Sequence, residues 1–68
     1  MLISTFFKEN ANAARAEVMK NEAGGYYYID YYDPGGNKVF TEAFPDKNVH
    51  FVEDAAENWA LGIKILRG

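Results

Sequence analysis

The pattern of apolar and polar positions divides this chain of 68 residues into four strand-like segments followed by one helix-like segment. Residues 2–8 are rich in β-branched and aromatic side chains and predict a short strand, and residues 9–13 predict a turn. Residues 14–19 alternate in the manner of a half-exposed strand, although their composition also suits a helix. We expect a strand, because a helix would leave few residues for the connections on either side.

Residues 26–32 and 37–44 predict a β-hairpin. The sequence between them, DPGG, contains an aspartate that opens a turn, a proline that fixes φ and two glycines that accept positive φ. Two strand-like segments joined by such a turn are typical of a hairpin. A second turn, predicted at residues 22–25, links this hairpin to the preceding strand.

An amphipathic helix is predicted after Pro45, which ends the last strand. Asn48 or Asp46 is the expected N-cap, and Gly62 is well placed as the C-terminal cap. Apolar residues at helical spacing form one stripe along the helix. The stripe consists of Val49, Val52, Ala56, Trp59 and Ile63.

These elements predict a single α+β domain over residues 1–68. We expect two layers: an antiparallel β-meander of three or four strands, and the C-terminal amphipathic helix packed on one of its faces. The predicted core consists of Ile29 in the sheet and the apolar stripe of the helix, with Trp59 at its centre.

All five tyrosines of the chain lie within residues 26–32. Alternate side chains of a strand point to opposite faces, so Ile29 marks the helix side and Asp30 marks the open side. The interaction surface predicted on the open side comprises Tyr26, Tyr28 and Tyr32, together with Phe40 or Phe44 of the next strand. Three interpretations stay open: structural residues of a half-exposed strand, a protein interface, or a platform on which bases stack.

The composition limits what can stabilise so short a chain. A domain of this length buries only about 60% of its unfolded surface, and disulfides, a metal or a partner subunit usually add stability. The chain has no cysteine, and its one histidine, His50, cannot make a zinc site by itself. Association with further copies remains, and we expect a homo-oligomer, with a dimer favoured.

The charge distribution argues against nucleic acid as a partner. The net charge is −3 and the seven basic residues are dispersed along the sequence, whereas a surface that binds phosphates needs them clustered. No segment approaches the roughly 20 apolar residues that cross a bilayer. We therefore expect no membrane partner and a cytoplasmic location.

The acidic residues form no recognisable catalytic or metal site. Glu53 and Glu57 are spaced to share a divalent cation, but no further ligand completes the set. Asp30 and Glu42 lie around the hairpin, where we expect no deep cleft. The sequence therefore predicts no catalytic residue, no metal and no cofactor, and a protein that is not an enzyme.

The sequence FVEDAAENWALGIKIL, preceded by YYIDYYDPGGNKVFTEAFP, resembles a group of small proteins of marine cyanobacterial viruses, the cyanophages. The resemblance covers about residues 15–66 and is densest at residues 55–64. It implies a viral source and a compact fold, and it implies no activity. In architecture the chain also resembles the arm-type DNA-binding domains of phage integrases. Those domains place basic side chains on the open sheet face, where this chain is expected to carry tyrosines and acids.

Together these observations predict a small, non-enzymatic, virus-encoded protein-interaction module that self-associates through its sheet. A host or viral protein is a further expected partner. The alternative is a nucleic-acid-associated accessory protein that uses the exposed tyrosine face. The charge balance favours the interaction module.

Overall fold

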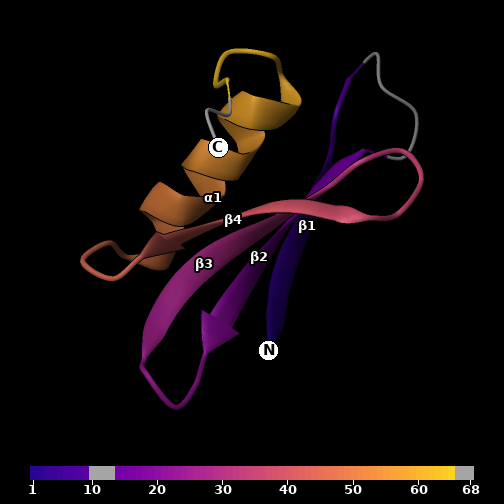
Figure 1. Ribbon diagram of the computed structural model, residues 1–68. Helices are drawn as coiled ribbons and strands as arrows, with labels where there is room; N and C mark the ends of the chain where they lie inside the picture. The colour runs from indigo at the N-terminus through magenta and orange to yellow at the C-terminus, as the bar shows by residue number, and fades with distance from the viewer. Residues whose placement is uncertain (10–13, 66–68) are drawn as a thin grey trace.

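The computed structural model describes residues 1–9 and 14–65, which form one antiparallel sheet and one helix (Figure 1). The elements are β1 (Leu2–Phe7), β2 (Arg15–Asn21), β3 (Tyr26–Tyr32), β4 (Lys38–Phe44) and α1 (Val49–Ala60). Strands that follow one another in the sequence are also neighbours in the sheet, in the order β1-β2-β3-β4. This meander with one C-terminal helix packed on it confirms the predicted α+β fold. Within the described residues, no helix is long and apolar enough to span a membrane.

The segment whose composition suits both a strand and a helix forms the strand β2. It pairs along its whole length with β3 and also pairs with β1, so it is a central strand. Ala16 and Val18 are fully buried on one side, whereas Arg15 and Glu17 on the other side are half-buried. The alternation outweighs helix propensity here, because pairing on both sides satisfies the backbone of β2 and one side enters the core. The turn predicted at residues 9–13 lies almost entirely outside the described residues.

The turn between β3 and β4 lies where its sequence predicts it, but only one of its two glycines takes the positive φ expected of both. Gly36 has a φ of 86°, in the left-handed region that glycine accepts at low cost. The backbone N–H of Gly36 donates to the carbonyl of Asp33 at 3.0 Å, and the N–H of Asn37 donates to the Asp33 side chain at 2.9 Å. Asp33 therefore closes the turn that brings β4 back along β3.

The helix α1 ends before the last residue of its predicted apolar stripe. It begins at the N-cap Asn48, whose side chain accepts the N–H of Phe51 at 2.9 Å. After the C-cap Leu61, Gly62 takes a φ of 84°, and this left-handed residue turns the chain away from the helix axis. Ile63 consequently lies outside the helix and is 70% exposed. Its assignment to the core is wrong for this reason.

The core lies between α1 and the part of the sheet formed by β1, β2 and β3. Its fully buried members from the predicted list are Ile29, Val52 and Ala56. Trp59 is 7% exposed and packs edge-on against Tyr31, with ring centroids 5.1 Å apart. Val49, the first residue of the helix, is only half-buried. Both halves of α1 therefore hold the helix to the sheet, with Val52 buried in the first half and the Trp59–Tyr31 contact in the second.

Replacing Trp59 by alanine is expected to lower the free energy of unfolding by about 3–5 kcal/mol, because the change leaves a cavity between helix and sheet. This loss is a large share of the stability of a domain of this size. Urea or thermal unfolding followed by circular dichroism measures it. Glu57→Ala, at an exposed position of the same helix, is the control and should change stability by less than about 0.5 kcal/mol. A Trp59→Ala protein that melts within a few degrees of the parent would contradict this core.

Candidate interaction surfaces

The side chains of β3 alternate between the two faces of the sheet. Ile29 and Tyr31 are fully buried toward α1. Tyr26, Tyr28 and Tyr32 lie on the opposite, open face, where each is half-buried. The neighbouring strands shelter part of each ring, so these tyrosines are less exposed than an unprotected aromatic patch would be.

Phe40 and Phe44 lie on the helix side of the sheet, and their assignment to the open face is wrong. Phe40 pairs with Tyr31, and Phe44 pairs with Tyr27. Directly paired residues of antiparallel strands point to the same face, and both phenylalanines pack against the core. The predicted interaction surface is therefore divided between the two sides of the sheet.

A β-bulge in β4 is the reason for this difference. Lys38 pairs with Tyr32, but the next paired residue is Phe40, so Val39 is an extra residue in β4. Without the extra residue, Phe40 would lie opposite Asp30 on the open face. One inserted residue moves every following side chain to the other face of a strand.

Three rows of side chains cross the open face from β1 to β4, in the register of the strand pairs. The apolar row consists of Leu2, Met19, Tyr28 and Ala43. The polar row consists of Thr5, Glu17, Asp30 and Thr41. The mixed row consists of Phe7, Arg15, Tyr32 and Lys38. The open face is therefore divided into bands of different chemistry and is not one continuous aromatic surface.

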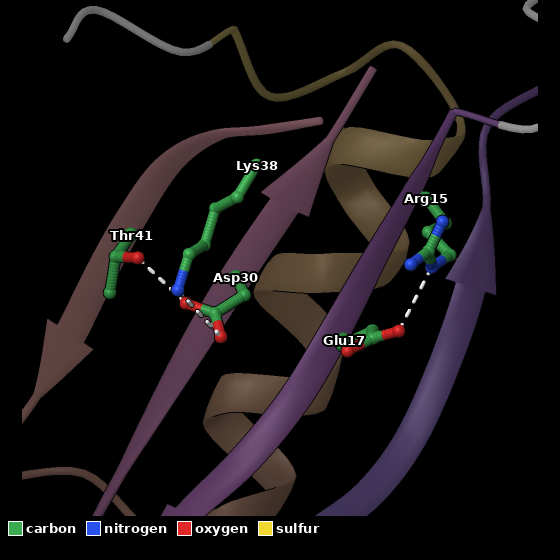
Figure 2. A network of polar contacts seen from close by, with 5 residues as sticks. All are labelled: Arg15, Glu17, Asp30, Lys38 and Thr41. Atoms are coloured by element: carbon green, nitrogen blue, oxygen red, sulfur yellow. Dashed lines mark hydrogen bonds and ion pairs between the residues drawn. The ribbon is translucent and has the colours of Figure 1, made fainter. Parts of the chain in front are cut away.

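Asp30, in the polar row, is only 6% exposed although α1 lies on the other side of the sheet. The hydroxyl of Thr41 donates a hydrogen bond of 2.6 Å to its Oδ1, and Nζ of Lys38 lies 3.8 Å from its Oδ2 (Figure 2). Glu17 lies directly across from Asp30 and accepts a hydrogen bond of 2.9 Å from Nε of Arg15. Each carboxylate has its own donor and its own cation, which offsets the repulsion between them.

Two of the three open-face tyrosines are held by neighbouring side chains. The guanidinium of Arg15 lies 4.1 Å from the centre of the Tyr32 ring, in a cation–π contact. The amide of Asn21 donates to the Tyr26 hydroxyl at 3.1 Å, and the Tyr26 ring lies 6.2 Å from that of Tyr28. These contacts order the tyrosines before any partner binds.

A groove of about 730 Å³ lies between α1 and β4 on the helix side of the sheet. It is present because α1 packs mainly against β1, β2 and β3. The apolar residues that line it are Phe44, Phe51, Ala55 and Ile63, and the polar ones are Glu42, Lys47, Asp54, Asn58 and Lys64. The rings of Phe44 and Phe51 meet edge to face, with centroids 6.0 Å apart. This size and this apolar lining suit the uptake of side chains from a partner.

Polar contacts fix the wall of the groove that β4 forms. The Tyr31 hydroxyl donates to Oε1 of Glu42 at 3.1 Å, and Nζ of Lys64 donates to its Oε2 at 3.4 Å. Burial, together with the negative charge of Glu42, raises the pKa of Tyr31 well above its ordinary value. Tyr31 therefore stays protonated at neutral pH and remains a donor to Glu42. Lys47 places its ammonium 4.8 Å from the centre of the Phe51 ring.

The acids of α1 do not gather into a metal site. The hydroxyl of Ser4 donates to Oε2 of Glu53 at 2.9 Å, so this carboxylate ties the helix to β1. Within the part of the chain that the structure describes, no group of three or more histidine, cysteine, aspartate or glutamate side chains is placed to hold a metal ion.

No protein-family model, no curated protein and no solved structure matches this chain. The geometry itself offers two candidate surfaces, the open face and the groove between α1 and β4. Sequence reasoning indicated the open face through the alternation of the tyrosines. It missed the groove, because the groove depends on the bulge in β4 and on where α1 lies across the sheet.

Replacing Thr41 by valine is expected to destabilise the protein by about 1–3 kcal/mol, because the buried Asp30 carboxyl group loses its closest hydrogen-bond donor. Thr5→Val, in the same row on the edge strand β1, is the matched control and should cost less than about 0.5 kcal/mol. Urea unfolding of the two variants beside the parent measures both values. Equal effects of the two substitutions would show that the Thr41–Asp30 hydrogen bond does not stabilise the fold.

Proposed function

We propose that this protein is a small, non-enzymatic interaction module that self-associates through its sheet, with a homodimer as the favoured assembly. The observation that carries the proposal is that the single helix covers only part of the four-stranded sheet. Large apolar side chains on and next to the sheet therefore stay exposed. They include Phe7 on the open face, Val39 in β4 and Phe51 and Ile63 beside the groove. A second copy would cover part of this surface and add the burial that a chain of 68 residues lacks.

The ordered open face supports a role in binding. A surface whose side chains are already held loses little conformational entropy when a partner arrives. Tyrosine suits such a surface, because its ring supplies contact area and its hydroxyl tolerates water. Tyr26 and Tyr32, fixed by Asn21 and Arg15, have these properties.

The contacts of the Glu17 and Asp30 carboxylates with neighbouring side chains support the proposal that the protein is not an enzyme. Glu17 and Asp30 are neighbours, as acid–base pairs in enzymes often are. However, Arg15 holds Glu17, and Thr41 and Lys38 hold Asp30. A general base must reach a proton of the substrate, and these contacts engage Oε2 of Glu17 and both oxygens of Asp30 with partners of the protein itself.

The charges of the open face favour protein over nucleic acid as a partner. The two cations Arg15 and Lys38 are matched by the two acids Glu17 and Asp30, and each cation lies against an acid. A surface that binds phosphates needs an excess of unpaired positive charge. The likeness to cyanophage proteins is the basis on which we propose a viral source and the host-cell cytoplasm. There a host or viral protein would be a second kind of partner.

Sedimentation equilibrium at micromolar concentration tests the proposal directly. We expect a mass of about twice the 7.7 kDa of one chain. Because dimerisation stabilises the folded state by mass action, the melting temperature should also rise with protein concentration. A protein that sediments as a monomer and melts independently of concentration would contradict self-association.

Binding to oligonucleotides separates the proposal from its alternative. At physiological salt we expect dissociation constants weaker than about 10 µM for single- and double-stranded DNA and RNA, within the nonspecific range. Fluorescence anisotropy with labelled oligonucleotides, repeated over a series of salt concentrations, measures this. A sub-micromolar constant that weakens steeply with salt would instead favour the nucleic-acid-associated accessory protein.

A further inference from the structure

The two edges of the sheet, β1 and β4, differ in what lies beside them. Beside β1 the helix is close, because Ser4 bonds to Glu53 and Nζ of Lys8 donates to the Trp59 carbonyl at 2.9 Å. Beside β4 lies the groove. A strand added to β4 would pair with its free backbone edge and could bury alternate side chains in the groove.

We infer that this added strand is β4 of a second copy, which pairs antiparallel with the first β4 and brings its own groove edge next to that of its partner. The inference rests on the proposed self-association and names the surface that carries it. A two-fold axis between the two strands makes the contact reciprocal, so each Phe40, still packed on its own core, comes to lie at the edge of the partner's groove. The product is a continuous sheet of eight strands, four from each copy, with both helices on the same side.

The sequence of β4 is complementary to itself in one register. With Thr41 opposite Thr41, each Phe40 lies opposite Glu42 of the other copy, and both residues face the helix side. Glu42 forms the wall of the groove, next to Phe44. This register therefore places Phe40, which stays packed against its own core, at the end of the partner's groove that Glu42 and Phe44 form. Shifting the pairing so that Glu42 faces Glu42 would place like charges opposite each other, which destabilises a strand pair.

The charges at the ends of β4 favour the antiparallel direction. In the register centred on Thr41, Asp46 lies two residues beyond Phe44, the residue opposite Lys38 of the other copy, although Lys38 also lies against Asp30 of its own chain. Lys47 lies opposite Gly35, two residues from Asp33 of the other copy. Among the described residues, neither Asp46 nor Lys47 takes part in an ion pair within its own chain. Such exposed pairs contribute little stability, but they oppose the parallel arrangement, which would bring like charges together.

The open face is less suited to contact its own copy. Glu17 and Asp30 lie side by side across its middle. Stacking two identical open faces would remove the Arg15–Glu17 and Lys38–Asp30 ion pairs of both copies from water, and the desolvation of charged groups is costly. Pairing through β4 keeps Glu17 and Asp30 outside the interface. It still covers apolar surface beside the groove.

Analytical ultracentrifugation of Phe51→Glu beside Tyr28→Glu tests the inference with matched changes of charge. Phe51 is 48% exposed and lines the groove, and Tyr28 lies at the centre of the apolar row of the open face. If β4 is the contact, Phe51→Glu should weaken the dimer at least about tenfold, whereas Tyr28→Glu should leave its affinity within roughly threefold of the parent. Circular dichroism checks that both variants are folded.

Hydrogen exchange of the parent protein gives a second measurement that needs no substitution. The amides of β4 should exchange more slowly at concentrations where the dimer forms, and those of the other edge strand, β1, should not change. A dimer that survives Phe51→Glu, dissociates on Tyr28→Glu or leaves β4 exchange unchanged would overturn the β4 contact while self-association stands. A parent protein that remains monomeric would instead refute both the proposed function and this inference.

Discussion

One helix cannot cover a four-stranded sheet, and the surfaces of this protein follow from that limit. A helix with its side chains is about 10–12 Å wide, and neighbouring strands are about 4.7–4.9 Å apart, so a helix covers two or three strands. Here α1 lies over β1, β2 and β3, and Trp59 shares the core with the small buried side chains of Ala14 and Ala16. What remains uncovered is the helix side of β4 and the whole opposite face.

The bulge at Val39 decides the chemistry of both uncovered surfaces. Because Val39 is an extra residue in β4, the two phenylalanines that follow it face the helix side and not the open side. Phe44 therefore lines the groove with an aromatic ring. The open face carries its tyrosines but neither of these phenylalanines. The same shift brings Glu42 within hydrogen-bonding distance of the Tyr31 hydroxyl. The single extra residue Val39 thus determines both the Tyr31–Glu42 hydrogen bond and which side chains of the edge strand β4 line the groove.

The open face is ordered by polar contacts and has no covering layer. Asp30 is almost fully buried by its neighbours alone, and its charge is tolerated because a hydroxyl and an ammonium satisfy it. Arg15 donates a hydrogen bond to Glu17 and also lies against the Tyr32 ring. The Arg15–Glu17 ion pair and the position of Tyr32 therefore depend on each other. Stacking this amphipathic face on a copy of itself would remove its two ion pairs from water. For this reason we assign self-association to the β4 edge and not to the open face.

The sequence by itself determined the elements whose signals are local. The DPGG turn, the alternation of β2 and β3, the Asn48 cap and the apolar stripe of the helix each depend on residues a few positions apart, and these elements predict the meander and its helix. Tertiary structure alone decided which side Phe40 and Phe44 occupy, because the pairing of β4 with β3 creates the bulge. Ile63 leaves the core because Gly62 turns the chain out of the helix, and this stop signal is also local, although the apolar stripe alone places Ile63 in the core. The groove has no signal in the sequence, because it is the space between elements whose relative placement is set only when the whole core packs.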